Sequence, residues 1–390
     1  MTSRAVGTIT HSVSAVTRVL QADDPEWDAW LDRTPHDIYH RAAYHQLAEQ
    51  SGEGKAQMIV HGNVEKFVAW PYMTSRITGN YTDASSVYGY TGPIGSGLAD
   101  NSFLLHAWTA MRAVWSEQQL VALFTRFHPV LKNYRYCNSL QGSGCPSGGE
   151  LYRPGRSVSI SLLPDHDERR RSYRKALRQE IQSAERSGLV VELDNDWSHF
   201  KTFAHFYRLT MEKNRASDRY LFTDEYFSSL RNALGDNGHL AVASVEGEAA
   251  AIMLFTVCGE IAQAHLTGVN PEFNAMSPLK CLIDGTAGFA KTFGAKLLHL
   301  GAGRGGFEDS LFTFKSRFSP VRHDFILGRW ILDSEKYDSL TTMHNSNKNN
   351  TNTFNPVGGT HSKTGDDPDN DKKDFFPAYR RPVVQETAIP

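Results

Sequence analysis

The stretch that most constrains the fold is AKLLHLGAGRGGFEDSLFTFKSRF at residues 295–318, where a short apolar run enters a glycine-rich turn. The run at 296–300 predicts a buried strand, and the residues after the turn predict an amphipathic segment. Glycine lets a ligand approach the backbone because it has no side chain. We therefore expect a ligand site to border this turn, which includes Gly301, Gly303 and Arg304.

The same glycines spell the pattern G-x-G-x-x-G, and Asp324 lies about twenty residues further on, as in dinucleotide-binding folds. Such a fold needs more β-α-β units after its first glycine turn. Here a single strand-like stretch, 323–332, follows before the composition becomes polar. We therefore expect the turn to lie at the end of a domain, and a dinucleotide-dependent enzyme that uses residues 301–306 is a minor alternative.

The composition is that of a globular chain. The 390 residues are 40% hydrophobic and 22% charged with a formal net charge of -2, which predicts two domains. The near-neutral charge argues against a protein that coats nucleic acid but permits a local basic patch. We expect no transmembrane segment, because the apolar runs are short, and the absence of a secretory signal pattern predicts a cytoplasmic location. The four cysteines lack metal-ligand spacing, so we expect reduced thiols and no metal site.

Helical and strand-like patterns mix in a similar way in both halves of the chain. We predict an α/β fold of two related domains, at 20–163 and 164–335, each a mixed, mostly antiparallel sheet flanked by helices. Residues 336–390 have too little apolar content to offset the entropy of ordering, which predicts a mostly disordered tail. Its aromatic and basic segment FFPAYRRP, at 375–382, leaves two interpretations open: docking on the body or on a partner, or no structure.

A basic helix is predicted at 165–187, with Gly188 ending it. Arg171, Arg174 and Arg178 share one helical face, together with Lys175. These cations could meet a phosphate-bearing ligand or an RNA backbone. The alternative is a solvated face on which the arginine stems cover apolar surface.

Four motifs in order resemble the Fem-type branch of the GNAT acyltransferase superfamily, which comprises peptidoglycan-bridge aminoacyl transferases and related amide-forming enzymes. They are YGYTGP at 88–93, FTRFHP at 124–129, RRSYRKALRQEIQSAERSG at 170–188 and GAGRGGFEDSLFTFKSRF at 301–318. The resemblance spans roughly residues 27–332. It implies two GNAT-like domains, of which the second binds the acyl donor, and transfer of an acyl or aminoacyl group to an amine.

The resemblance also implies that Phe314 and Lys315 lie at the transfer centre. Amine attack on an ester or thioester creates an oxyanion, and the Lys315 ammonium would stabilise that charge in the transition state. Phe314 would pack beside the donor, unless it is a core residue. Glu308 or Asp309 could take the proton of the attacking amine, with a helix cap as the stronger alternative for Asp309.

The donor and acceptor are predicted only by class. The sequence GVNPEFNAMSP before the helix expected at Pro278 lacks a glycine-rich pyrophosphate loop, which favours aminoacyl-tRNA over acyl-CoA as co-substrate. No permanently bound cofactor is expected, and tRNA is a candidate partner. Tyr88 and Tyr90 would contact the acceptor, a small-molecule, sugar or peptide amine. A non-catalytic GNAT-fold binding protein is the alternative function.

Overall fold

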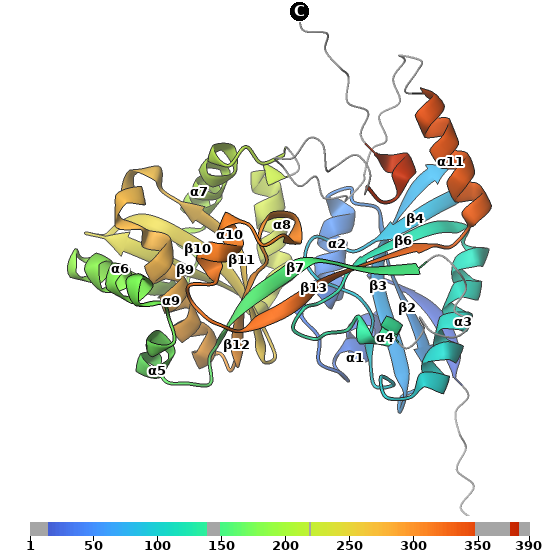
Figure 1. Ribbon diagram of the computed structural model, residues 1–390, viewed down its shortest axis with the longest axis horizontal. Coiled ribbons are helices and arrows are strands. Elements are labelled where there is room, and N and C mark those ends of the chain that lie inside the picture. Colours follow the sequence, from blue (N-terminus) through green and yellow to red (C-terminus); the bar gives the residue numbers. More distant parts are fainter. Residues whose placement is uncertain (1–14, 139–148, 218–219, 348–374, 382–390) are drawn as a thin grey trace, which may run out of the picture.

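The computed structural model describes residues 15–138, 149–217, 220–347 and 375–381, and these form one mixed sheet with helices on both faces (Figure 1). The strand order is β1-β2-β3-β4-β6-β13-β7-β12-β11-β10-β9-β8, and short β5 pairs with β3. The strands are β1 (Val16–Gln21), β2 (Lys55–Gly62), β3 (Phe67–Thr78), β4 (Tyr81–Ser85), β5 (Ile94–Gly95), β6 (Leu120–Arg126), β7 (Gly149–Ser161), β8 (Leu189–Asp194), β9 (Gly238–Val245), β10 (Glu248–Cys258), β11 (Ile261–Val269), β12 (Leu297–Gly301) and β13 (Arg322–Ile331).

In the first half of the chain, β1 to β4 are antiparallel neighbours and β6 lies parallel to β4. Helix α3 (Asn101–Glu117) covers this part of the sheet because Trp108 and Trp115 pack against Trp70 of β3. The helix begins after Asp100, whose carboxylate accepts a hydrogen bond from a first-turn N–H. The other helical segments of this half are α1 (Glu26–Leu31), η1 (Ile38–His40), α2 (Ala42–Gln50) and α4 (Arg135–Asn138).

In the second half, β8 to β11 are antiparallel and β12 lies parallel to β11. Two hydrophobic clusters lie on this part of the sheet. Helices α6 and α9 contribute to one cluster, and α7 and α8 contribute to the other. The helical segments are α5 (His166–Arg171), α6 (Lys175–Arg186), α7 (Phe200–Lys213), α8 (Asp224–Leu234), η3 (Gly235–Asn237), η4 (Pro271–Met276), α9 (Pro278–Thr292), η5 (Arg304–Gly306), α10 (Ser310–Lys315) and α11 (Ser334–Asn347).

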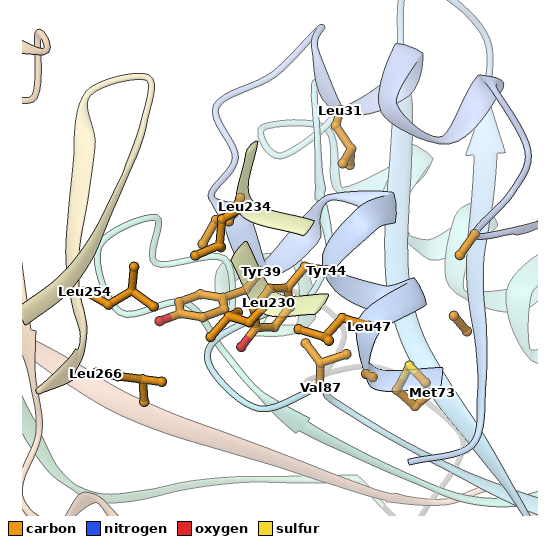
Figure 2. Packing of buried hydrophobic residues seen from close by; sticks show 14 of the residues in the cluster. Leu31, Tyr39, Tyr44, Leu47, Met73, Val87, Leu230, Leu234, Leu254 and Leu266 are labelled. Atoms are coloured by element: carbon orange, nitrogen blue, oxygen red, sulfur yellow. The ribbon is translucent and has the colours of Figure 1, made fainter. Parts of the chain in front are cut away.

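The long strands β7 and β13 join the two halves (Figure 1). Strand β7 pairs with β12, and β13 pairs with both β7 and β6, so the last strand returns to the first half of the chain. The halves also share a hydrophobic core: Tyr39 and Tyr44 pack in one cluster with Leu230 of α8 and with Leu254 and Leu266 of the second-half sheet (Figure 2). The α/β fold class with a mixed sheet flanked by helices is confirmed. Because the sheet is continuous, the domain boundary after residue 163 stays a prediction.

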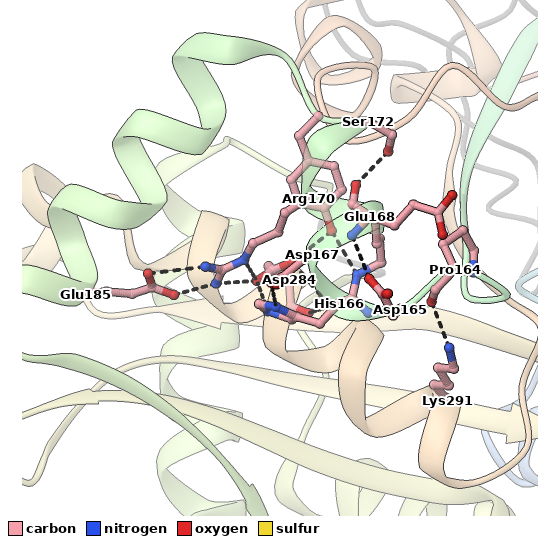
Figure 3. A network of polar contacts seen from close by, with 12 residues as sticks. Pro164, Asp165, His166, Asp167, Glu168, Arg170, Ser172, Glu185, Asp284 and Lys291 are labelled. Atoms are coloured by element: carbon pink, nitrogen blue, oxygen red, sulfur yellow. Dashed lines mark hydrogen bonds and ion pairs between the residues drawn. The ribbon is translucent and has the colours of Figure 1, made fainter.

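The prediction of one basic helix at 165–187 is wrong, because α5 and α6 are separate helices with a break at residues 172–174. The break buries Tyr173, whose hydroxyl donates to Asp284 Oδ1 over 2.9 Å. Arg170 donates from Nε to Asp284 Oδ2 over 2.8 Å and also pairs with Glu185 (Figure 3). Helical periodicity could not reveal this break, because its cause is a buried acid on α9.

The predicted tail is partly structured. Helix α11 continues the chain after β13, and residues 375–381 dock on the body, as one interpretation of the FFPAYRRP segment predicted. Arg380, almost fully buried, donates from Nε to Asp83 Oδ2 over 2.5 Å and from Nη2 to Asp83 Oδ1 over 2.9 Å. The disorder predicted for 348–374 and 382–390 concerns residues outside the described ranges.

Candidate active site

A cavity of about 840 Å³ lies where the glycine turn and β11 of the second half meet η1, α2 and the loop after β4 of the first half. It combines aromatic walls with a few polar side chains, which is typical of small-molecule sites. Its lining includes Tyr39, Tyr88, Tyr90, Tyr220, Gln263, His265, Gly301, Gly303 and Lys315.

The glycine turn and Lys315 meet in this cavity, as the sequence predicts. Gly301 has φ +80°, and a Cβ there would lie 3.2 Å from Tyr90 Oη and 3.4 Å from Lys315 Nζ. The missing side chain thus lets two polar groups approach the backbone. Lys315 Nζ donates to the carbonyl oxygen of Ala302 over 2.6 Å. Burial lowers the pKa of Lys315 to about 8, against an opposing effect of the Asp309 carboxylate.

The two tyrosines predicted for the acceptor side also line this cavity. Tyr88 and Tyr90 flank Gly89, where a Cβ would lie 2.3 Å from the Tyr39 ring. Glycine in the sequence YGY therefore allows Tyr39 to pack against the loop, and the Tyr39 and Tyr90 rings meet edge to face with centroids 5.9 Å apart. Tyr88 in turn contacts Tyr220, so the wall combines both halves of the chain.

The two acids predicted as proton acceptors lie outside the cavity lining. Asp309 caps α10, since Oδ1 accepts from Phe312 N over 2.9 Å, and Oδ2 accepts from Arg304 N over 3.2 Å. A Cβ at Gly303 would lie 2.1 Å from Asp309 Oδ1, so this glycine makes room for the cap. Glu308 binds both Arg156 Nε and Nη2, and these hydrogen bonds lower its pKa.

Phe314 and Lys315 face different cavities. Phe314 lines a second cavity of about 270 Å³, at the start of α9, together with Lys213 and Lys280. Its ring also contacts Phe318 edge to face, with centroids 5.7 Å apart. Helix α10 therefore contributes its Phe to one cavity and its Lys to the other.

The predicted basic residues line neither cavity. Arg171 and Arg174 are exposed, and Arg174 is the last residue of the break, directly before α6. Arg178 Nη1 donates to the carbonyl oxygens of Arg171 and Tyr173, over 3.0 and 2.6 Å. This arginine therefore stabilises the backbone of the break between α5 and α6. Of the three, Arg171 and Arg174 are exposed and Arg178 is partly buried.

A buried network of polar side chains, which the sequence patterns did not predict, borders the large cavity. Asp37 Oδ2 lies 2.8 Å from His128 Nε2 and accepts from Gln263 Nε2 over 2.6 Å. Gln263 Oε1 lies 2.7 Å from His299 Nδ1, so this network of side chains joins the two halves of the protein. Burial lowers the pKa of His299 well below its usual value. Gln263 and His265 alternate on β11, and polar residues within the apolar pattern of 261–267 were the signal for them.

Within the described ranges, no group of His, Cys, Asp or Glu is arranged to hold a metal ion. The helices of the same residues include none that is long and apolar enough to cross a membrane.

Comparisons with known proteins agree with this architecture. Residues 171–309 match the family model described as acetyltransferase (GNAT) domain. The chain is similar to the crystal structure of FemX, with a TM-score of 0.64 and 15% identity over 83% of this chain and 99% of FemX. It is also similar to the structure of L-PGS from Bacillus licheniformis, with a TM-score of 0.49 and 15% identity over 82% of this chain and 95% of that one. No curated protein matches the chain.

Residues 171–309 thus resemble a GNAT acetyltransferase domain, and the fold of the chain is similar to that of FemX. The resemblance to the Fem-type branch predicted from the four sequence motifs is thereby confirmed, with the FemX fold extending over most of the chain. The glycine turn is followed by the antiparallel strand β13 alone, and no further parallel β-α-β unit follows in the described part of the chain. This arrangement does not fit the dinucleotide alternative.

Proposed function

We propose that the protein transfers an acyl or aminoacyl group from an ester or thioester donor to an amine, with Lys315 stabilising the oxyanion. The observation that carries the proposal is the position of Lys315 Nζ, which lies at the glycine turn inside a cavity walled by Tyr88 and Tyr90. An ammonium held by a backbone carbonyl is already oriented before the reaction begins. Preorganised charge of this kind stabilises a transition state more than a ground state.

The two cavities on either side of α10 suggest separate places for the two substrates. The second cavity contains Lys213 and Lys280 and opens at the start of α9. Lys280 is paired with Glu180 over 3.2 Å, so the helix N–H groups and Lys213 are the groups that favour an anionic donor there. The large cavity has room for the acceptor and for the reacting end of the donor. In this arrangement Phe314 contacts the donor, and Lys315 contacts the carbonyl that reacts.

Aminoacyl-tRNA is the donor we favour. Residues Pro271–Met276 form the 3-10 helix η4, and Ser277 adopts a left-handed conformation before Pro278. The approach to α9 is therefore not a glycine-rich loop of the kind that holds the pyrophosphate of coenzyme A. Acyl-CoA is the alternative donor, because the matched domain is named for acetyl transfer.

The test supplies both donors separately. The protein is incubated with charged bulk tRNA or with acetyl-CoA, using cell extract as the source of acceptors, and mass spectrometry detects new amides. We expect one donor to give an amide product, and Lys315→Met to lower its rate about 100-fold or more, as loss of one oxyanion donor does. Lys201→Met is the matched control, because Lys201 is exposed on α7 and lines neither cavity.

A folded Lys315→Met variant with full transfer activity would contradict the role of this residue. Binding of a donor without turnover by the wild-type protein would instead favour a non-catalytic GNAT-fold binding protein.

A further inference from the structure

The proposed reaction needs a group that takes the proton of the attacking amine, and the following inference rests on that proposed function. Glu308 and Asp309 do not supply this group from the cavity wall, because each is held by arginine or backbone donors outside it. A base must lie within hydrogen-bond reach of the amine. The base is therefore one of the side chains that line the large cavity.

His265 of β11 is the candidate, because it lines the same cavity as Gly301 and Lys315. Its side chain lines the large cavity and is 9% exposed. Among the described residues, its Nε2 has no hydrogen-bond partner. A buried polar atom without a partner costs free energy, and a bound ligand that supplies the partner removes that cost.

The other ring nitrogen of His265 is already held. Nδ1 lies 3.0 Å from the hydroxyl of Tyr39. The tautomer that donates Nδ1–H to Tyr39 Oη leaves a lone pair on Nε2, and the same hydrogen bond stabilises the imidazolium after Nε2 accepts a proton.

The surroundings keep the His265 ring neutral before substrate binds. Burial lowers its pKa to about 4, partly opposed by the negative charge of Asp37. The titratable side chains in ring contact with it are Tyr39 of η1, Tyr44 of α2 and Tyr88 of the loop after β4, with centroids 5.7, 6.0 and 6.1 Å away. Burial raises the pKa of Tyr39 and of Tyr44, so these two phenols stay protonated at neutral pH.

We propose that His265 is the general base of the transfer and that the acceptor is a primary amine bound against the aromatic wall. As the amine nitrogen bonds to the donor carbonyl carbon, its proton moves to Nε2, and the carbonyl electron pair moves to the oxygen beside Lys315. The carbonyl then re-forms and the C–O bond of an ester, or the C–S bond of a thioester, breaks. The departing oxygen or sulfur takes the proton from His265. Nε2 is buried in the structure, so the acceptor reaches it when a neighbouring side chain moves.

The test compares two acceptors in His265→Asn, using whichever of charged tRNA or acetyl-CoA is active in the wild-type protein. Asparagine keeps an amide N–H near the position of Nδ1 but has no basic nitrogen. With the amine acceptor found in the extract, we expect kcat to fall about 100-fold, within the range that one general base contributes. With hydroxylamine we expect a fall of less than about 5-fold, because its weakly basic adduct loses a proton to water without help. His205→Gln on α7 is the control, since His205 is exposed and lines neither cavity.

Three outcomes overturn the inference. An unchanged rate with the amine acceptor removes His265 from the chemistry, and an equal loss with both acceptors shows a structural role. Absence of any amide or hydroxamate from the wild-type protein instead overturns the proposed function, and this inference with it. A thermal melt checks the fold of the variant, and His265→Gln replaces it if asparagine prevents folding.

Discussion

At the scale of single residues, Lys315 is a charged group in an unfavourable place. Its side chain is only partly exposed, and the carbonyl oxygen of Ala302 is the hydrogen-bond partner of its ammonium. An ion pair would neutralise the ammonium, but Asp309 uses its own oxygens to cap α10 and to bind Arg304. The protein therefore keeps a positive charge available for an oxyanion, at a cost in stability.

Lys315→Met should stabilise the protein while it removes activity. Burial lowers the pKa of Lys315 from 10.5 to about 8, so the unfolded chain binds more protons between these two values. Below about pH 8 the lysine lowers the free energy of unfolding by about 1–3 kcal/mol. This value is smaller than the full pKa shift would give, because the side chain is partly exposed. The increase in the free energy of unfolding of Lys315→Met should be largest below pH 8 and should become smaller as the pH approaches 10.5. Urea unfolding across this pH range measures it, and an equal or lower stability of the variant at pH 7 would contradict the argument.

At the scale of elements, the basic stretch consists of helices α5 and α6, and its arginines fall into two groups. Arg169 and Arg170 bind Asp284, and Arg178 closes the break between the helices, so these arginines hold the fold together. The exposed Arg171 and Arg174 have no such task. A polyanionic donor would meet these two.

Arg171→Glu with Arg174→Glu should weaken binding of charged tRNA if RNA is the donor. Losing two phosphate contacts should reduce the slope of log affinity against log salt by about 1.4–1.8, with kcat at saturating donor unchanged. A filter-binding titration at several salt concentrations measures this slope. The control with an equal charge change is Arg76→Glu with Lys201→Glu, since both residues are exposed and lie outside the cavities. An unchanged slope would show that these arginines do not contact RNA and form a solvated face of the protein.

At the scale of the whole molecule, the segment 375–381 ties the end of the described chain to β3 and β4. Arg380 binds Asp83 and donates to the carbonyl oxygens of Ser75 and Arg76. Phe376 packs against the cluster of Phe124, Phe325 and Leu327, and the last two of these line the large cavity. The segment thus supports the cavity wall from behind.

Arg380→Ala should lower the free energy of unfolding by about 3–5 kcal/mol, because it leaves the Asp83 carboxylate buried without its cation. Calorimetry or urea unfolding measures the loss. The double variant Arg380→Ala with Asp83→Asn should recover part of it, because the unpaired charge is then gone. A loss below about 1 kcal/mol for the single variant would mean that the segment is not held to the body in solution.

The local pattern of the sequence was sufficient for the parts of the site that lie close together in the chain. Gly301, Gly303 and Lys315 share one strand, turn and helix, and Tyr88 and Tyr90 share one loop, so short-range spacing already indicated them. The α/β class followed from the same local periodicity. Propensity and pattern act over a few residues, which is the range of these features.

Tertiary structure alone decided how these pieces meet. The contact between Tyr39 and His265 joins residues 226 positions apart, and the same separation divides Gln263 from Asp37. Asp284 on α9 accepts a hydrogen bond from Tyr173 in the break of the basic helix, and Asp83 forms an ion pair with Arg380. Strand β13 pairs with β6 of the first half. Burial and pairing between distant segments determine these features, because a polar side chain excluded from water must find a partner wherever the fold supplies one.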